Sequence, residues 1–367
     1  MVRRPALPLI RLGEPDQRLA SQLGIALGVA FTICFVTGLL SHAIQDPPSW
    51  FAWPSRPVQL YRITQGLHVA TGIVAVPLLL AKLWSVYPRL FEWPPVRDLP
   101  HLLSRLTALI LVPTAILEVV TGGLNIARWY AAMPFSFRTT HHWTAWILTG
   151  ALAVHLAVKL PIVARALGRA AAPDPRRRGV LAGVVAAASA LTATTVGQTL
   201  RPLAGLGILA PRRPSIGPQG LPVNRSAVQA GITAAARDPG YRLRVDGPRH
   251  LVLSLADLAA RPQYTVSLPI ACVEGWSATA TWTGVRVRDL LDAVGAPPHA
   301  RLRVESLQHR VSSILPAAHC RDPLTLLALR IGGEPLHLDH GYPCRLIAPN
   351  LPGVMQTKWV RRLVVLT

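Results

Sequence analysis

Apolar residues fill five long runs in the first 200 positions of the chain, and polar residues gather mainly in the segments between them. The runs cover residues 22–43, 63–86, 102–126, 140–163 and 180–200. Each is close to the length of about 20 residues that a helix needs to span the hydrocarbon of a bilayer. The pattern therefore predicts an all-α transmembrane bundle of five helices over residues 1–200.

The rest of the chain has a different pattern, in which no apolar run is long enough to span a bilayer. Residues 201–240 are rich in Pro, Arg and Gly without periodicity, which indicates a linker. Alternating segments typical of strands follow at residues 241–247, 265–273 and 301–307. Short helices are predicted over residues 287–294 and 324–329, and Gly332-Gly333 suits a hairpin turn. Residues 241–367 are thus predicted to form an α+β, mainly β, domain.

The composition agrees with a membrane domain, since 51% of the 367 residues are hydrophobic and only 15% are charged. The formal net charge is +21. The basic residues form short clusters beside the apolar runs, without one amphipathic face interleaved with aromatic residues, so nucleic-acid binding is not expected. By the positive-inside rule the clusters predict a multi-pass protein of the cell membrane. Lipid would surround the helices, the N-terminus would be cytoplasmic, and the C-terminal domain would be extracytoplasmic.

Histidines gather near the predicted outer side of the bundle. His68 lies about two turns into the second run, His141 and His142 open the fourth run, and His42 ends the first. An ionisable residue in a membrane helix is costly and is by default a functional candidate. Two imidazoles from different helices can ligate a six-coordinate haem, and we expect His68 and His141 to be that pair. His42 and His142 are alternates, and hydrogen bonding within the bundle is the ordinary alternative role for all four.

A second haem is left open by His155, which lies about 21 Å along the helix from His141 and on the same face. This spacing resembles that of dihaem cytochromes, and the general pattern resembles bacterial membrane b-type cytochromes. The sequence offers no obvious partner for His155 near the inner face, so one haem b is predicted. Glu118 is a further intramembrane group. It could accept a proton from a bound quinol or form a hydrogen bond to a neighbouring helix.

One cysteine of the C-terminal domain stands in a distinctive setting. Cys272 lies within SLPIACVEGWS (residues 267–277), which is followed by WTGV (282–285), GEPLHLDHGYPCRLIAPNLPG (333–353) and TKWV (357–360). In order and spacing these motifs resemble the molybdopterin-binding domain of the sulfite oxidase family over residues 220–367. The resemblance implies that Cys272 binds molybdenum directly, a role that suits a soft thiolate. The alternative is a buried free cysteine that fills apolar space.

The same resemblance implies the contacts of the pterin cofactor. Arg345 and Lys358 match the family's basic anchors for the pterin phosphate, and His340 and Asn224 match further cofactor contacts. Lysine is rare in this chain, and Lys358 is the only one beyond residue 200. Such sparing use favours a site that needs a compact ammonium group, although a solvated surface lysine is the alternative.

The chain departs from the sulfite oxidases directly after the metal cysteine. Val273-Glu274-Gly275-Trp276 stands where they have Ala-Gly-Asn-Arg, and no arginine-rich oxyanion pocket can be assigned near Cys272. This departure puts sulfite in doubt as the substrate. Oxygen-atom transfer with another small oxo substrate is the safer prediction, and the bacterial methionine sulfoxide reductase branch of the family is one relative to consider.

Together these features predict a membrane-bound, molybdopterin-dependent oxidoreductase that exchanges electrons with the quinone and quinol pool through a membrane haem b. The alternative is a membrane cytochrome whose soluble domain binds a partner without catalysis. Arg176-Arg177-Arg178 precedes the fifth run. These arginines fit either an internal twin-arginine export signal, which a domain folded around its cofactor would need, or a plain positive-inside cluster.

Overall fold

The structure is a computed structural model that describes residues 16–90, 96–168, 174–196 and 201–367. Three arginines that support the predicted cytoplasmic N-terminus (Arg3, Arg4 and Arg11) lie outside the described residues, as do the last positions of the fifth apolar run (197–200). The chain divides into two compact units, Met1–Val36 with His68–Thr192 and Thr37–Leu67 with Ala193–Thr367. This division groups the segment between the first two apolar runs with the C-terminal strands.

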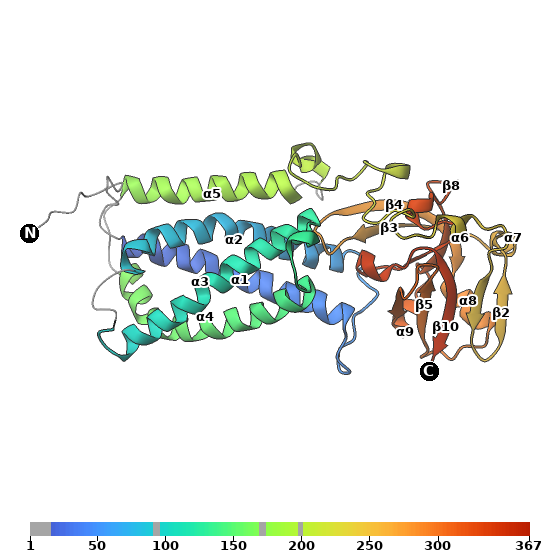
Figure 1. Ribbon diagram of the computed structural model, residues 1–367, viewed down its shortest axis with the longest axis horizontal. Helices are drawn as coiled ribbons and strands as arrows, with labels where there is room; N and C mark the ends of the chain where they lie inside the picture. Colours follow the sequence, from blue (N-terminus) through green and yellow to red (C-terminus); the bar gives the residue numbers. More distant parts are fainter. Residues whose placement is uncertain (1–15, 91–95, 169–173, 197–200) are drawn as a thin grey trace, which may run out of the picture. The chain divides into compact units, whose positions relative to one another are not determined.

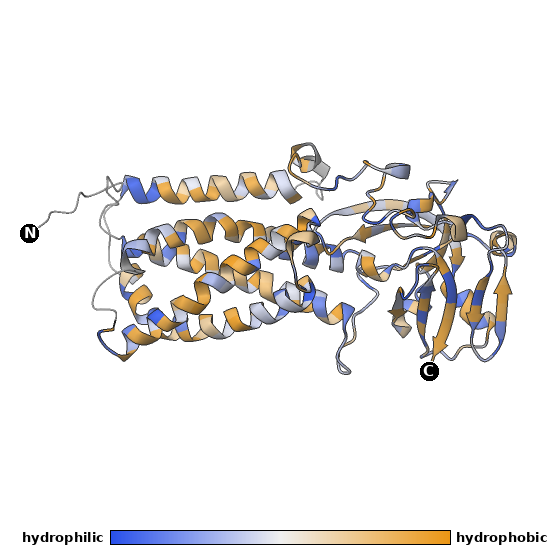
Figure 2. Ribbon diagram, viewed as in Figure 1, coloured by the Kyte–Doolittle hydropathy of each residue, from blue (hydrophilic) through white to orange (hydrophobic). Residues whose placement is uncertain are grey.

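Five long helices account for the five apolar runs (Figure 1). They are α1 (Gln17–Gln45), α2 (Leu60–Leu90), α3 (Leu99–Ala127), α4 (Phe137–Gly168) and α5 (Pro175–Val196). Each is long and apolar enough to cross a membrane, and Figure 2 shows hydrophobic residues along most of their length. Large apolar side chains such as Leu80, Leu109 and Leu160 are exposed on the helix surfaces. The predicted set of five apolar helices is therefore confirmed.

Local sequence explains how α3 begins and ends. Asp98 precedes α3 in an extended conformation, and its carboxylate accepts a hydrogen bond from the backbone N–H of His101. Such an N-cap satisfies one of the free donors of the first turn. Arg128 ends α3 in the left-handed conformation and donates its backbone N–H to Asn125 O. Pro113 inside α3 is of a kind that membrane helices tolerate.

The second unit is built around two sheets. The first sheet has the strand order β2-β1-β10-β5-β6, and in the second the order is β3-β4-β7-β8 with β9 paired to β7. The strands of the first sheet are β1 (Leu243–Asp246), β2 (His250–Leu253), β5 (Arg301–Ser306), β6 (Ser312–Leu315) and β10 (Val360–Leu366). Those of the second sheet are β3 (Tyr264–Ala271), β4 (Ser277–Arg286), β7 (Leu326–Ile331), β8 (Glu334–Pro335) and β9 (Arg345–Ile347). The mainly β prediction for this part of the chain is confirmed.

Short helices fill the connections, and one of the predicted helices is wrong. The prediction over 287–294 is confirmed as α8 (Val287–Ala293), whereas residues 324–329 mostly lie in strand β7. Five of the six residues of β7 are buried, because the strand lies between β4 and β9. A continuous apolar run of this length cannot be assigned to helix or strand by periodicity alone. Gly332-Gly333 forms the predicted turn, between β7 and β8.

The remaining helices of the second unit are short. They are the α-helices α6 (Thr233–Arg237), α7 (Leu255–Ala260) and α9 (Ala317–Arg321), and the 3₁₀ turns η3 (Arg201–Leu206), η4 (Pro218–Gly220), η5 (Leu338–His340) and η6 (Gly353–Met355). Residues 201–240, predicted to be a linker, contribute Leu221, Ala227 and Ile232 to buried clusters. Ile44 and Tyr61, from the ends of α1 and α2, are also buried in the main core of this unit.

Candidate functional site

Cys272 occupies the turn between strands β3 and β4. The two strands pair up to Ala271 and Ser277, and beyond them the backbone N–H of Cys272 donates to Trp276 O at 2.8 Å. The N–H of Gly275 donates to Cys272 O at 3.1 Å. Gly275 has a φ of +90°, a conformation that glycine adopts without steric cost. The thiol is therefore buried on a short, internally bonded turn at the end of a hairpin.

Asn224 lies directly against the cysteine sulfur. Its amide Nδ2 donates to Cys272 Sγ at 3.0 Å, and its Oδ1 accepts a hydrogen bond from the indole Nε1 of Trp276 at 3.2 Å. The indole N–H can only donate, so it fixes the amide with its NH₂ group toward the sulfur. A donor aimed at sulfur stabilises the thiolate over the thiol. The structure thus brings two of the predicted site residues, Cys272 and Asn224, into contact.

Arg345 supplies a buried positive charge to the same region. It lies in β9, only 6% exposed, with its guanidinium carbon 5.5 Å from the centre of the Trp282 ring. Burial lowers the pKa of Arg345 to about 10, while the charge of Cys272 acts in the opposite direction. The guanidinium is therefore still protonated at neutral pH, and its charge favours the thiolate form of Cys272.

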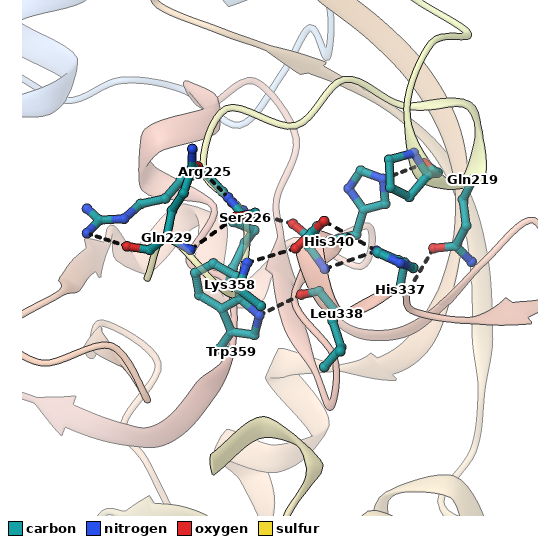
Figure 3. Close-up of polar contacts among 12 residues, drawn as sticks. Gln219, Arg225, Ser226, Gln229, His337, Leu338, His340, Lys358 and Trp359 are labelled. Atoms are coloured by element: carbon teal, nitrogen blue, oxygen red, sulfur yellow. Dashed lines mark hydrogen bonds and ion pairs between the residues drawn. The ribbon is translucent and has the colours of Figure 1, made fainter. Parts of the chain in front are cut away.

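His340 and Lys358 lie in one hydrogen-bonded network (Figure 3). His340 Nε2 donates to Pro218 O at 2.6 Å, and burial lowers the pKa of His340 to about 4, so the ring is neutral at pH 7. Lys358 Nζ donates to Arg225 O at 2.5 Å and to Asp339 O at 2.8 Å. The ammonium group therefore joins the chain before β1 to the loop that carries His340.

Gly341 allows this loop to pack closely against the basic residues. It has a φ of +113°, and a Cβ atom at this position would lie 3.0 Å from Arg345 Cβ and 3.2 Å from Lys358 Cβ. A larger residue would therefore push the two basic side chains apart. In this way the glycine keeps His340, Arg345 and Lys358, three of the predicted cofactor residues, on one compact region of the domain.

These residues fit the group that the sequence resemblance implies. A soft thiolate can bind a high-valent metal, and fixed positive charge can bind a phosphate. Among the buried polar atoms without a hydrogen-bond partner in the described residues are Arg345 Nε and Ser277 Oγ, which directly follows the turn of Cys272. Buried polar groups are normally satisfied, so these atoms mark a place where a polar ligand would bind.

Two histidines of the long apolar helices also come together. The ring centres of His68 and His141 are 6.3 Å apart, with the ring planes at 84°. His68 Nδ1 donates to Cys34 O at 2.8 Å, and His141 Nδ1 is 2.9 Å from Glu118 Oε2. Hydrogen bonds at Nδ1 fix the tautomer that presents Nε2 to a metal. For Glu118 the structure shows the hydrogen-bonded alternative, and the quinol role stays untested.

The other histidines have different neighbours. His142 has aromatic contacts with Trp143 and Trp146, at 5.4 and 6.5 Å between ring centres. His155 Nδ1 lies 3.0 Å from the hydroxyl of Thr107. His42 lies in the last turn of α1. The structure thus brings together the rings of His68 and His141, the pair expected from the sequence.

A contact that sequence reasoning missed reaches the turn of Cys272 from the start of α2. The amide Nε2 of Gln65 donates to the carbonyl oxygen of Val273, at 2.9 Å, although the two residues are 208 positions apart. Gln65 is 4% exposed. A polar amide near the start of an apolar run was the one signal for it in the sequence.

Comparison with known proteins agrees with this site. Residues 230–367 match the family described as the oxidoreductase molybdopterin binding domain. This part of the chain is therefore similar to the molybdopterin-binding domain of the sulfite oxidase family, in agreement with the resemblance of the motifs around Cys272. Its relatives include proteins named as sulfite oxidases and oxidoreductases.

Three relatives illustrate the likeness. The uncharacterized oxidoreductase YuiH of Bacillus subtilis is 34% identical over 118 residues, 32% of this chain and 59% of that protein. Sulfite oxidase of Gallus gallus is 31% identical over 164 residues, 36% of each chain. The putative protein-methionine-sulfoxide reductase subunit YedZ1 of Azospira oryzae is 31% identical over 128 residues, 34% of this chain and 48% of that protein. The chain thus spans between about one third and three fifths of the length of these relatives.

Proposed function

We propose that this protein is a membrane-bound molybdopterin-dependent oxidoreductase that transfers an oxygen atom to or from a small substrate and exchanges electrons with the quinone pool through haem b. The observation that carries the proposal is the setting of Cys272. Its buried sulfur accepts an N–H from Asn224, and the charge of Arg345 acts on it within a domain of the molybdopterin family. When bound, the molybdenum cofactor would supply two-electron oxygen-atom transfer.

The residues of the chain would divide the work of holding this cofactor. Cys272 would donate its thiolate to the metal, and the N–H of Asn224 would moderate the charge on that sulfur. Arg345 and Lys358 would bind the phosphate of the pterin, since guanidinium and ammonium groups form strong charge-assisted hydrogen bonds with it. His340, being neutral, would contribute a hydrogen bond without adding charge.

His68 and His141 would hold the haem iron in the membrane part. In support, both rings use Nδ1 for hydrogen bonds to Cys34 O and Glu118, an arrangement that orients metal-ligating histidines. Two neutral imidazoles give a haem that passes single electrons. His155, beside Thr107, is the candidate for a second haem.

The membrane placement of the five helices is part of the proposal. Their length and apolar character support it. The C-terminal domain would lie outside the cytoplasm, by the positive-inside rule.

Methionine sulfoxide is the first substrate to test. One relative is named as a subunit of a putative protein-methionine-sulfoxide reductase, and reduction of a sulfoxide is an oxygen-atom transfer.

The decisive experiment replaces Cys272 and compares it with another buried cysteine of the same domain. Cys272→Ser should lower dye-driven turnover of methionine sulfoxide by more than about 100-fold, beyond the usual effect of losing an outer-shell partner of a metal ligand. Cys320→Ser is the matched control, because Cys320 is also buried and free. It should keep both molybdenum and turnover.

Metal analysis and a visible spectrum of the purified wild-type protein complete the test. Molybdenum with a b-type haem spectrum supports the proposal, and a haem spectrum without molybdenum would favour the non-catalytic alternative. His68→Ala and His141→Ala should each remove the haem signal, whereas loss of only half the signal in His155→Ala would reveal a second haem. Full turnover in Cys272→Ser would overturn the assignment of the metal ligand.

A further inference from the structure

The end of α1, the loop that follows it and the start of α2 form the α1–α2 segment (Thr37–Leu67). This segment is folded into the same compact unit as the molybdopterin-binding domain. Residues Thr37–Leu67 belong to that unit, although they precede the matched domain by more than 150 positions. Tyr61 is 1% exposed and lies in the main core of the unit, with Phe51 and Trp53 packed against that core. The segment is therefore a structural part of the catalytic unit.

Within the α1–α2 segment, Gln65 contacts the residue that directly follows the candidate metal ligand. Its side-chain amide donates to Val273 O at 2.9 Å, and Val273 directly follows Cys272. The amide is itself oriented, because Gln65 Oε1 accepts a hydrogen bond from the hydroxyl of Tyr61 at 3.4 Å. The hydrogen bond therefore restrains the Val273–Glu274 peptide unit, the second after the cysteine, within the turn that carries Cys272.

Asn350 attaches the segment to the other side of the same turn. Its Oδ1 accepts from the backbone N–H of Tyr61 at 2.6 Å, and its Nδ2 donates to Pro54 O at 2.6 Å. Two residues further on, Pro352 forms a bridge with Ala271, the residue before Cys272. The backbone is thus held on both sides of the cysteine, by Gln65 at Val273 and by Pro352 at Ala271, and the segment is bound to Asn350, two residues before Pro352.

A third attachment is electrostatic. The guanidinium of Arg56 binds Asp322 with two hydrogen bonds, of 3.0 Å from Nε to Oδ2 and 3.1 Å from Nη2 to Oδ1. The carboxylate is buried, while the arginine is half exposed. Paired hydrogen bonds of this kind fix direction as well as distance. The segment is therefore held at three separate places on the domain.

We propose that the α1–α2 segment is a positioning element of the molybdenum site, in which Gln65 fixes the Val273 peptide and thereby the direction of the Cys272 thiolate. This inference rests on the proposed function. The turn has only two internal backbone hydrogen bonds of its own, and both involve Cys272. An external donor on the Val273 carbonyl therefore restricts rotation of the Val273–Glu274 peptide, and it fixes the conformation of the turn from which the Cys272 side chain projects. Outer partners of this kind orient metal ligands and tune the metal.

The test removes the donor without changing the size of the side chain. Gln65→Met loses the amide, and Gln65→Glu keeps its shape but has no N–H to donate while ionised. Gln59→Met is the matched control, because Gln59 is exposed in the same segment. All are made in the full chain with both cofactors loaded. Both Gln65 variants should keep wild-type molybdenum and haem content, shift the molybdenum electron-resonance signal, and lower dye-driven turnover about 10- to 100-fold.

The controls separate this inference from the proposed function. Wild-type protein without molybdenum would contradict the proposed function itself. If the wild type holds molybdenum, an unchanged resonance signal and unchanged turnover in both Gln65 variants would overturn the positioning role. Loss of molybdenum from both variants would overturn it as well, because Gln65 would then act in retaining the cofactor instead of orienting its ligand.

Discussion

Asn350 offers the sharpest test of how the α1–α2 segment is attached. Its side chain accepts from Tyr61 N and donates to Pro54 O, and its own carbonyl oxygen accepts from the indole of Trp53 at 2.8 Å. It is 3% exposed and has a φ of +55°, a left-handed conformation that Asn adopts more readily than most residues. Asn350→Ala would remove both side-chain hydrogen bonds and leave a less suitable residue in that conformation.

The expected cost follows from these contacts. The backbone N–H of Tyr61 would lose its partner in a buried position, at about 2 kcal/mol. Alanine in the left-handed region adds about 1 kcal/mol. The carbonyl of Pro54, an exposed residue, can turn to water and adds little. Asn350→Ala should therefore destabilise the second unit by about 3 kcal/mol.

Thermal unfolding of the full chain in detergent measures this difference. For a unit of this size each kcal/mol corresponds to roughly 2 to 4 °C in Tm. Asn350→Ala should lower the unfolding temperature of the second unit by about 6 to 12 °C. A loss below about 2 °C would refute the attachment through Tyr61.

Two further predictions concern the same unit. His319 is fully buried, and burial lowers its pKa to about 4. The stability that its neutral form contributes is present above pH 6.5 and is lost as the pH falls toward 4, so His319→Gln should flatten the fall in Tm over that range; an equally steep fall would count against it. Trp276→Phe removes the indole donor to Asn224, and it should keep molybdenum while shifting the resonance signal and lowering turnover about 10-fold. A wild-type signal in Trp276→Phe would show that Asn224 does not depend on the indole.

The five long helices could be predicted from the sequence, whereas strand β7 could not. The five apolar runs are long and continuous, and each became a helix within a few residues of its predicted bounds. The helix predicted over residues 324–329 was wrong because strand β7 has no alternating pattern. Its residues Leu326, Leu327, Ala328 and Leu329 are all buried. Its identity depends on the neighbouring strands β4 and β9, which no local pattern contains.

The candidate site divides in the same way. Cys272 could be predicted because the motif around it is local and distinctive. Asn224 was predicted as a cofactor residue, but its hydrogen bond to the sulfur and the contact of Gln65 could not be predicted. Asn224 lies 48 positions away from Cys272, and Gln65 lies 208 positions away from Val273. Neither residue lies in a distinctive local motif, and only the folded structure shows which atom each one binds.

These partners act on the cysteine through two kinds of interaction, a charge from Arg345 and directional hydrogen bonds from Asn224 and Gln65. The charge of Arg345 falls off slowly with distance and favours the thiolate whatever its direction. The hydrogen bonds from Asn224 to the sulfur and from Gln65 to the next carbonyl weaken steeply when their geometry changes. Loss of the charge should therefore weaken retention of the anionic ligand and cofactor, whereas loss of a directional bond should leave the metal in place with altered electronic properties. Because Gln65 lies in the first turns of α2, its hydrogen bond connects this part of the helix to the turn of the candidate ligand within one compact unit.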